Sequence, residues 1–306
     1  MERQLTEVFP SVQALIHGII DYAGLFPPAK LGMEDTVRNY AAYHDDADAW
    51  MLNRLIIPIA RLEEFELHAA DLLPHEENAE PWPISGLTAQ AGDDNLSKHL
   101  EIITAFNSKH TDPEHGLAII DTIELKGSSL DAIEHTLDLL PDEVFPFFEI
   151  PLASDCRGMI AALVGSDAGA KIRTGGVTAD LYPSSETVAR FIVACARAGV
   201  PFKATAGLHH PLRHYSEAVT TEEHGFLNVF AAATFAHTYD WDEDAIRTLL
   251  EDEDASSFAF APDQLTYHDT TVSTEEIEHT RNLIAISFGS CSFDEPREDL
   301  RALNLR

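Results

Sequence analysis

The sequence predicts a single (β/α)₈ barrel, an α/β fold in which eight parallel strands alternate with helices. Two observations favour it. Short apolar runs of strand length alternate with helical patterns over most of the chain, and eight such runs can be identified, the number that closes a barrel. An open dinucleotide-binding sheet would carry a GxGxxG motif after its first strand, and no such motif follows the first run. We therefore expect one domain over residues 1–306.

The first two thirds of the alternation can be placed from periodicity. The run at 52–60 is almost continuously apolar, which is typical of a strand buried on both faces. In chain order the patterns predict a helix at 3–16, a strand at 16–29, a helix at 33–48, a strand at 52–60, a helix at 61–71, a strand at 81–90, a helix at 96–109, a strand at 116–127, a helix at 131–139, a strand at 144–152 and a helix at 156–164.

Residues 170–211 predict one complete β–α–β unit. A strand at 170–174 leads through two glycines into a helix, and a second strand follows at 202–206. Ser184 or Ser185 can cap the start of this helix, and Gly199 ends it. Such a right-handed crossover makes the two strands parallel.

The remaining chain predicts strand eight at 225–237, running directly into its helix. Residues 240–306 are then expected to form a final helix plus an acidic C-terminal extension, with 274–285 helical. Two roles stay open for this extension. It covers the barrel, or it forms a contact between copies of the chain in a homo-oligomer.

The net charge of the chain argues against two classes of binding partner. The chain has 52 Asp and Glu against 20 Lys and Arg, a formal charge of -32, and six lysines. This balance argues against nucleic acid and against an anionic membrane as partners. It is similar to that of cytoplasmic proteins from salt-accumulating halophiles, although an acidic surface on a mesophile protein is the alternative. The three cysteines have no CxxC spacing, and no signal peptide or membrane span is evident, so we expect a cytoplasmic protein.

Charged residues gather at the predicted strand ends. Side chains alternate along a strand, so Lys171 and Arg173 share one face of their strand, and Lys203 and Thr205 share one face of the next. Glu124 with Lys126, and Glu149, end the two preceding strands. Neighbouring strands would crowd these cations into one small space at the mouth of the barrel.

Crowded cations change lysine chemistry. A nearby cation and desolvation both lower the pKa of a lysine, and a neutral lysine can attack a carbonyl to form a Schiff base. In this hypothesis Lys171 is the nucleophile, Lys203 tunes it, Glu149 or Glu124 moves protons, and Arg173 or Lys126 holds an anionic group. The substrate would be a small carbonyl or anionic molecule, with no cofactor and no metal. The alternative is that the lysines form structural ion pairs, for example Lys126 with Glu149.

The two lysine motifs, AKIRTGG and FKATAGL, resemble those of the class I deoxyribose-phosphate aldolase family, whose fold is a (β/α)₈ barrel. The resemblance implies that Lys171 takes the Schiff-base position and Lys203 the position of its partner. It covers roughly residues 118–230. The chain departs from the family at Arg173, where a small hydroxyl residue is expected, and at Ala206, where glycine is expected.

Two further departures concern proton transfer and substrate. The strand-four aspartate of the family has no direct match, so Glu124 and Asp121 are both candidates for the proton relay. His209 and His210 have no family counterpart, which leaves the substrate open. The predicted substrate-binding residues are Arg173, Lys126, Thr205, Gly175, Gly176, Gly207, His209, His210, Asn228 and Asp21. The glycines can offer backbone amides to an anion or can simply form tight turns.

Two other functions remain open from the sequence. Histidines and carboxylates at strand ends can hold a divalent metal, which would make the protein a metal-dependent lyase or hydrolase. Candidate ligands are His17, His209, His210, His214, Asp21, Glu124 and Glu149, although no HxH or HExxH spacing is present. The third function is a non-catalytic anion-binding or assembly subunit.

Overall fold

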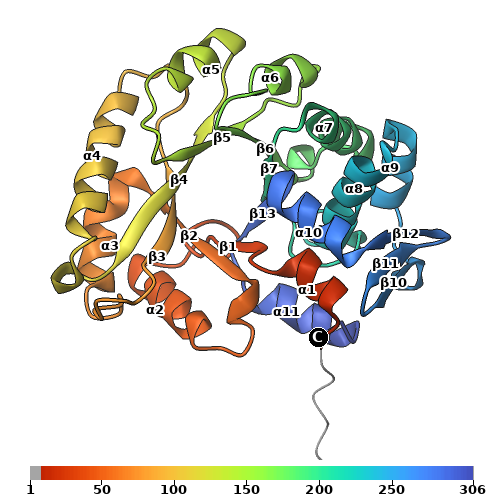
Figure 1. Ribbon diagram of the computed structural model, residues 1–306, viewed down its shortest axis with the longest axis horizontal. Coiled ribbons are helices and arrows are strands. Elements are labelled where there is room, and N and C mark those ends of the chain that lie inside the picture. Colours follow the sequence, from red (N-terminus) through yellow and green to blue (C-terminus); the bar gives the residue numbers. More distant parts are fainter. Residues whose placement is uncertain (1–7, 306) are drawn as a thin grey trace, which may run out of the picture.

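The computed structural model describes residues 8–305, and within this range eight parallel strands form a closed barrel (Figure 1). The predicted (β/α)₈ barrel is therefore confirmed. Around the barrel the strands follow the order β1, β13, β7, β6, β5, β4, β3, β2, and β2 pairs with β1 to close it. The barrel strands are β1 (Ile20–Tyr22), β2 (Leu52–Pro58), β3 (Trp82–Leu87), β4 (Ala118–Lys126), β5 (Phe145–Glu149), β6 (Gly169–Arg173), β7 (Phe202–Thr205) and β13 (Ala285–Ser290).

Helices cover the outside of the barrel (Figure 1). In chain order they are α1 (Pro10–Ile16), α2 (Met33–His44), α3 (Leu62–Ala69), α4 (Leu96–Lys109), α5 (Leu130–Leu137), α6 (Arg157–Ala161), α7 (Ser185–Ala198), α8 (Phe226–Tyr239), α9 (Glu243–Leu250), α10 (Thr274–Leu283) and α11 (Asp294–Ala302). Short 3-10 turns are η1 (Ala49–Met51), η2 (Ile59–Arg61), η3 (Pro113–His115), η4 (Ala179–Leu181) and η5 (Ala255–Ser257). The portion of the predicted first helix at 3–7 lies outside the described residues. No helix within residues 8–305 is long and apolar enough to cross a membrane.

Helix α7 shows how local sequence sets an element. The hydroxyl of Ser184 accepts a hydrogen bond from the backbone N–H of Thr187, which caps the first turn. Gly199 ends the helix with a φ of 64°, a left-handed conformation that glycine adopts without strain. The apolar side of the helix is buried, and Phe191 packs edge-on against Phe202 of β7. The predicted crossover between β6 and β7 is thus confirmed.

The prediction of strand eight at 225–237 is wrong. This segment is helix α8, and the eighth barrel strand is β13, which lies in the predicted C-terminal extension. A run that is apolar on all sides has no period that separates a buried strand from a buried helix. Three consecutive alanines, 231–233, favour the helix. The strand β13 was missed because its sequence, AISFGS, is short and mixes serines and glycine with apolar residues.

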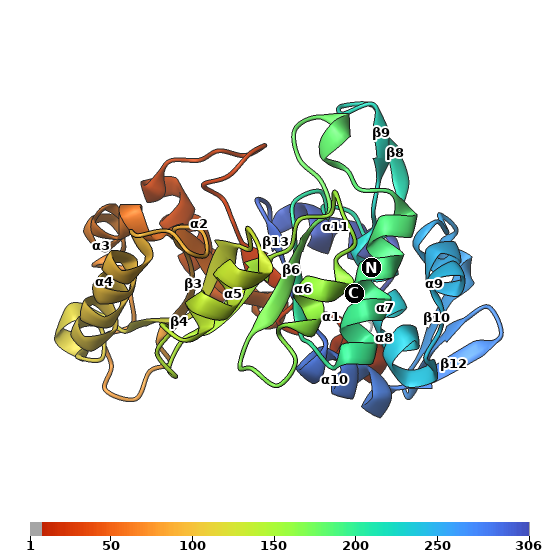
Figure 2. The same cartoon turned by 90° about the horizontal axis from the view of Figure 1, so that it is seen from above.

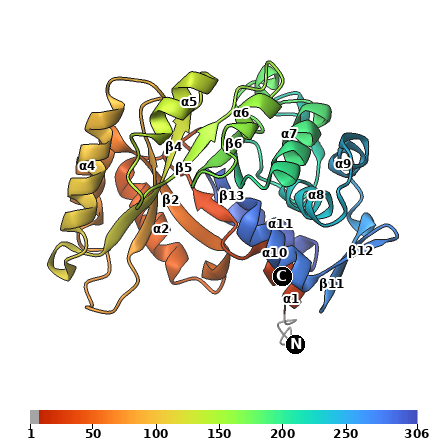
Figure 3. The ribbon, with the colours of Figure 1, turned by 45° about the horizontal axis from the view of Figure 1, so that its top comes forward.

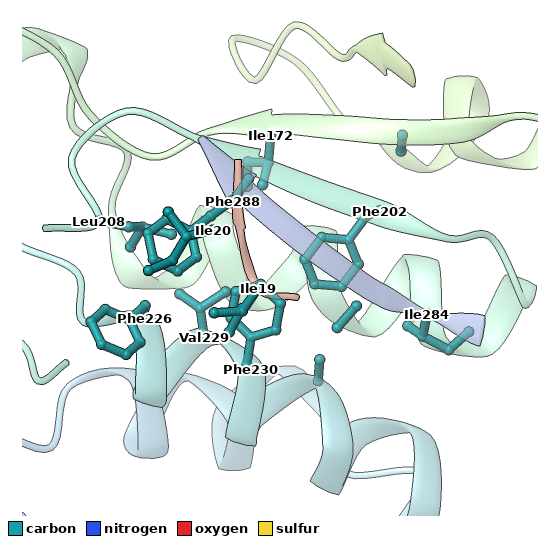
Figure 4. Close-up of a cluster of buried hydrophobic side chains, with 14 of the residues drawn as sticks. Ile19, Ile20, Ile172, Phe202, Leu208, Phe226, Val229, Phe230, Ile284 and Phe288 are labelled. Atoms are coloured by element: carbon teal, nitrogen blue, oxygen red, sulfur yellow. The ribbon is translucent and has the colours of Figure 1, made fainter. Parts of the chain in front are cut away.

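Helix α8 is apolar all round because it is covered on both sides. Toward the barrel, Phe226 stacks on Phe288 of β13 with ring centroids 5.3 Å apart, and Phe230 lies 6.0 Å from the same ring (Figure 4). On its outer side it contacts α7, α9 and α10. Figure 3 shows α9 and the sheet of β10 (Phe258–Ala261), β11 (Gln264–Tyr267) and β12 (Thr270–Ser273) beyond α8, at the edge of the molecule.

The loops that follow β6 and β7 rise on the same side of the barrel (Figure 2). The second of them contains a hairpin of β8 (His214–Ser216) and β9 (Thr221–Glu223). The hydroxyl of Tyr182, in the first loop, donates a hydrogen bond to Glu223 of β9 over 3.1 Å. Burial and the charge of Glu223 raise the pKa of Tyr182 to about 12, so this phenol stays a donor. The two loops are therefore joined beside the C-terminal ends of the strands.

Candidate active site

Strand register brings the predicted charged residues together at the C-terminal end of the barrel. Glu149 of β5 is paired with Lys171 of β6, and Lys171 is paired with Lys203 of β7. All three side chains form salt bridges: Glu149 with Lys171, and Lys171 and Lys203 with Glu124 of β4. The prediction that the two lysines lie on neighbouring strands is confirmed, although neither is the last residue of its strand.

Lys171 lies between two carboxylates. Its Nζ is 2.8 Å from Oε2 of Glu124, on β4, and 2.9 Å from Oε2 of Glu149. Its side chain is 4% exposed, so these contacts are screened little by water. Glu149 also binds Arg173, whose Nε is 3.0 Å from Oε1 and whose side chain is 41% exposed.

Lys203 lies deeper and crosses the interior of the barrel. Its Nζ is 2.5 Å from Oδ2 of Asp21, on β1, and 2.5 Å from Oε1 of Glu124. Glu124 therefore bridges Lys171 and Lys203 with its two oxygens. Asp21, expected to bind substrate, instead lies beneath Lys203 and holds it in place.

Two serines complete the hydrogen bonding of the buried carboxylates. The hydroxyl of Ser287, on β13, donates to Asp21 over 2.6 Å, and that of Ser85, on β3, donates to Glu124 over 2.8 Å. We name this set the ion network: Asp21, Glu124, Glu149, Lys171, Arg173 and Lys203, with Ser85 and Ser287. It joins three carboxylates to three cations, so its members largely compensate one another's charges.

The ion network sets the direction of the pKa shifts of its buried members. Burial by itself lowers the pKa of Lys203, but the charges of Asp21 and Glu124 outweigh it and raise that pKa above its ordinary value. Burial raises the pKa of Glu124, yet the two lysines hold it well below its usual range. Glu149 follows the same pattern, with Lys171 and Arg173 lowering its pKa against burial. The lysines do not simply repel each other, because Glu124 lies between them.

A pocket of about 260 Å³ opens above the ion network. Lys171 lines it, whereas Lys203 lies below it. One wall is apolar, with Phe26, Ile56 and Leu181 among its residues. The predicted site residues that line the pocket are Glu124, Lys171, Arg173, Gly176, Thr205 and His209. Its volume suits a ligand of a few carbon atoms.

The glycines at the strand ends have a packing role. A Cβ atom on Gly175 would lie 2.8 Å from Cα of Gly207, and one on Gly207 would lie 2.9 Å from Cα of Gly175. The loops after β6 and β7 can approach this closely because both positions lack side chains. Ala206 beside them has a φ of 62°, and the Thr174 hydroxyl donates to its carbonyl. Ala206 lines the pocket in this strained conformation, which residues at functional sites often adopt.

Three predicted site residues lie elsewhere. Lys126, at the end of β4, is exposed and is not part of the pocket wall. Asn228 lies on α8, where its amide donates to the carbonyls of Leu249 and Asp252 and so joins α8 to the chain after α9. Asp121, the other candidate for the proton relay, pairs with Arg54 near the start of its strand.

The histidines after β7 bind carboxylates of α11. His209 Nδ1 is 3.1 Å from Glu295, and His210 Nδ1 is 2.5 Å from Asp299, so His210 is turned to the helix and does not line the pocket. Within residues 8–305, no group of three or more His, Cys, Asp or Glu side chains is arranged to hold a metal ion. The ligand set expected for a metal site is therefore not brought together.

Several functional residues were not predicted. Ser85 and Ser287 are buried polar residues on mostly apolar strands. A serine within an apolar run is visible in the sequence and could have indicated a buried polar contact. The ring centroid of Phe147, on β5, lies 5.7 Å from Lys203 Nζ. Cys291 is buried, at 7% exposed, and lines the pocket.

Fold and site together define a (β/α)₈ barrel protein with a small pocket over a buried ion network. A scan against models of protein families found no match for the chain, and a search of curated proteins found no significant relative.

Proposed function

We propose that the protein is a lyase of the class I aldolase type, which binds a small carbonyl compound as a Schiff base on Lys171. The observation that carries the proposal is the position of Lys171. It is the lysine of the pocket wall, and its amine contacts two carboxylates that can exchange protons with it. A (β/α)₈ barrel with charged residues at the C-terminal strand ends supports catalysis in this place.

Each neighbour has a distinct role in this proposal. Glu124 lines the pocket and contacts both lysines, so it is placed to take the proton that Lys171 must lose before attack. A carboxyl whose pKa is held low returns that proton readily, which suits loss of water from the carbinolamine. Lys203 keeps Glu124 in position and stabilises its negative charge. Arg173, half-exposed at the pocket, offers the rest of its guanidinium to an anionic group of the substrate.

A binding protein without turnover is the second candidate. It is favoured by the complete pairing of both lysines with carboxylates, which is also what a structural ion network requires. In that case Lys171 stays an ammonium group that contacts an anion, and no covalent bond to a ligand forms.

Reductive trapping separates the two candidates. The protein is incubated with small aldehydes, 2-oxo acids and sugar phosphates in the presence of cyanoborohydride, and modified peptides are mapped by mass spectrometry. We expect an adduct on Lys171 that is lost in Lys171→Met and kept in Lys126→Met, the matched control at an exposed strand-end lysine. Binding of an anion without an adduct would favour the non-catalytic candidate. Modification spread evenly over exposed lysines would contradict Schiff-base chemistry at this site.

A further inference from the structure

Cleavage or formation of a carbon–carbon bond needs an acid–base group besides the Schiff-base lysine. Five titratable side chains are among those that line the pocket: Glu124, Lys171, Arg173, His209 and Cys291. The first three belong to the ion network. There, each oxygen of Glu124 already contacts a lysine, 2.8 Å from Lys171 and 2.5 Å from Lys203, so this carboxylate serves the proton of Lys171 rather than a substrate hydroxyl.

Cys291 is a poor proton acceptor for a different reason. Burial raises the pKa of its thiol above the ordinary value, which keeps it protonated near neutral pH. His209 therefore remains as the pocket residue with a ring nitrogen suited to proton transfer.

A contact with Glu295 orients the imidazole ring of His209. Nδ1 lies 3.1 Å from Oε2 of Glu295, on α11, and the side chain is 16% exposed. If Nδ1–H donates to Glu295, the other nitrogen, Nε2, is left as an acceptor for a ligand. The next residue, His210, binds Asp299 one turn further along α11, so two contacts hold this loop to the helix.

We propose that His209, oriented by Glu295, is the acid–base residue for a 3-hydroxycarbonyl substrate that is bound to Lys171 as an imine. This role rests on the proposed Schiff-base function and names the substrate class. His209 and Lys171 line the same pocket of about 260 Å³, so a molecule of a few carbons reaches both. Glu295 is a positioning residue that acts through His209.

The step balances as follows for the cleavage direction. Nε2 of His209 removes the proton of the substrate hydroxyl, and the carbon that carries this oxygen becomes an aldehyde carbonyl. The bond between this aldehyde carbon and the carbon next to the iminium breaks. The electron pair of the broken bond forms the carbon–carbon double bond of a neutral enamine on Lys171. The positive charge lost from the iminium is now on the imidazolium, beside the carboxylate of Glu295. The enamine carbon then takes this proton back from the imidazolium, which restores the iminium and a neutral His209. Hydrolysis of the iminium by water releases the second product and regenerates the lysine.

The test uses two defined probes, neutral 3-hydroxybutanal and anionic 4-hydroxy-2-oxobutanoate, on the full-length protein. We expect His209→Gln to keep the cyanoborohydride adduct on Lys171, which also reports that the barrel is folded, while cleavage slows by about 100-fold or more. In Glu295→Gln, whose side chain is half-exposed, kcat should fall with KM unchanged. His210→Gln is the matched control and should cleave within about twofold of the wild type, since it changes a loop contact outside the pocket. Added imidazole should restore part of the activity of His209→Ala.

Different results would overturn the Schiff-base function of Lys171 and the acid–base role of His209. No adduct on Lys171 of the wild-type protein overturns the Schiff-base function and the role of His209 together. An adduct without cleavage of either probe overturns the retro-aldol step and with it the role of His209, and leaves the Schiff base standing. Adduct and cleavage that both persist at wild-type rates in His209→Gln overturn only the role of His209.

Discussion

Replacing Lys203 with methionine tests how much the ion network contributes to the stability of the barrel. Lys203 Nζ lies 2.5 Å from both Asp21 and Glu124, and its side chain is 1% exposed. Methionine keeps most of the apolar stem but removes the charge, so two buried carboxylates lose a shared cation. Breaking a buried ion pair from one side costs about 3–5 kcal/mol, because the remaining charge is left uncompensated. We expect the free energy of unfolding to fall by that amount in urea at pH 7.

The loss should depend on pH in a defined direction. In the wild type the lowered pKa of Glu124 contributes stability above the unfolded carboxyl value of about 4.3, and the raised pKa of Lys203 contributes stability below the unfolded amine value of about 10.4. Without Lys203, the pKa of Glu124 rises toward its ordinary value. As the pH falls, protonation of the unpaired carboxylate removes part of the destabilisation. The difference in free energy of unfolding between Lys203→Met and the wild type should therefore shrink from pH 7 to pH 4.

Two further variants complete this experiment. Lys126→Met removes an exposed lysine from the end of β4 and should change the free energy of unfolding by less than about 0.5 kcal/mol. Adding Asp21→Asn to Lys203→Met removes one of the orphaned charges and should recover part of the loss, which a double-mutant cycle measures. A deficit below about 1 kcal/mol for Lys203→Met, or one that grows toward pH 4, would refute the argument.

Three other predictions concern the pocket, the corrected helix and the surface. Arg173→Met should raise KM for an anionic carbonyl compound by about ten- to a hundredfold, because a charge-assisted hydrogen bond is lost, and should leave KM for a neutral aldehyde nearly unchanged; equal effects on both would contradict a role in anion binding. Asn228→Ala should lower the free energy of unfolding by about 1–3 kcal/mol, since the carbonyls of Leu249 in α9 and of Asp252 after it lose their donor, without changing the extent of trapping on Lys171; loss of trapping in a folded variant would show that Asn228 contributes to the site. Raising KCl from 0.1 M to 2 M should raise Tm, because salt screens the repulsion within a chain of charge -32; a Tm that stays constant or falls in circular-dichroism melts would contradict the halophile-like interpretation of the composition and favour an ordinary acidic surface.

Much of the fold follows from local patterns. Helix α4 spans Leu96–Lys109 as periodicity predicts, and α7 begins at its predicted serine cap and ends at Gly199. Period and caps act within a few residues along the chain, so they can be identified without knowing the tertiary structure. The first strand was predicted over 16–29 and is only Ile20–Tyr22, since boundaries depend on where neighbouring strands stop pairing.

The sequence by itself determined the barrel class, the alternation of its first seven strands and the presence of Lys171 and Lys203 on neighbouring strands. Only the tertiary structure decided that β13 closes the barrel and that Glu124 lies between the two lysines. Glu124 is 47 residues from Lys171 and 79 from Lys203, and Asp21 is 182 residues from Lys203. Period-two alternation assigns a side chain to a face, but barrel closure sets which faces meet. For that reason the placement of the two lysines on neighbouring strands was predicted correctly, whereas the position of Glu124 between them was not.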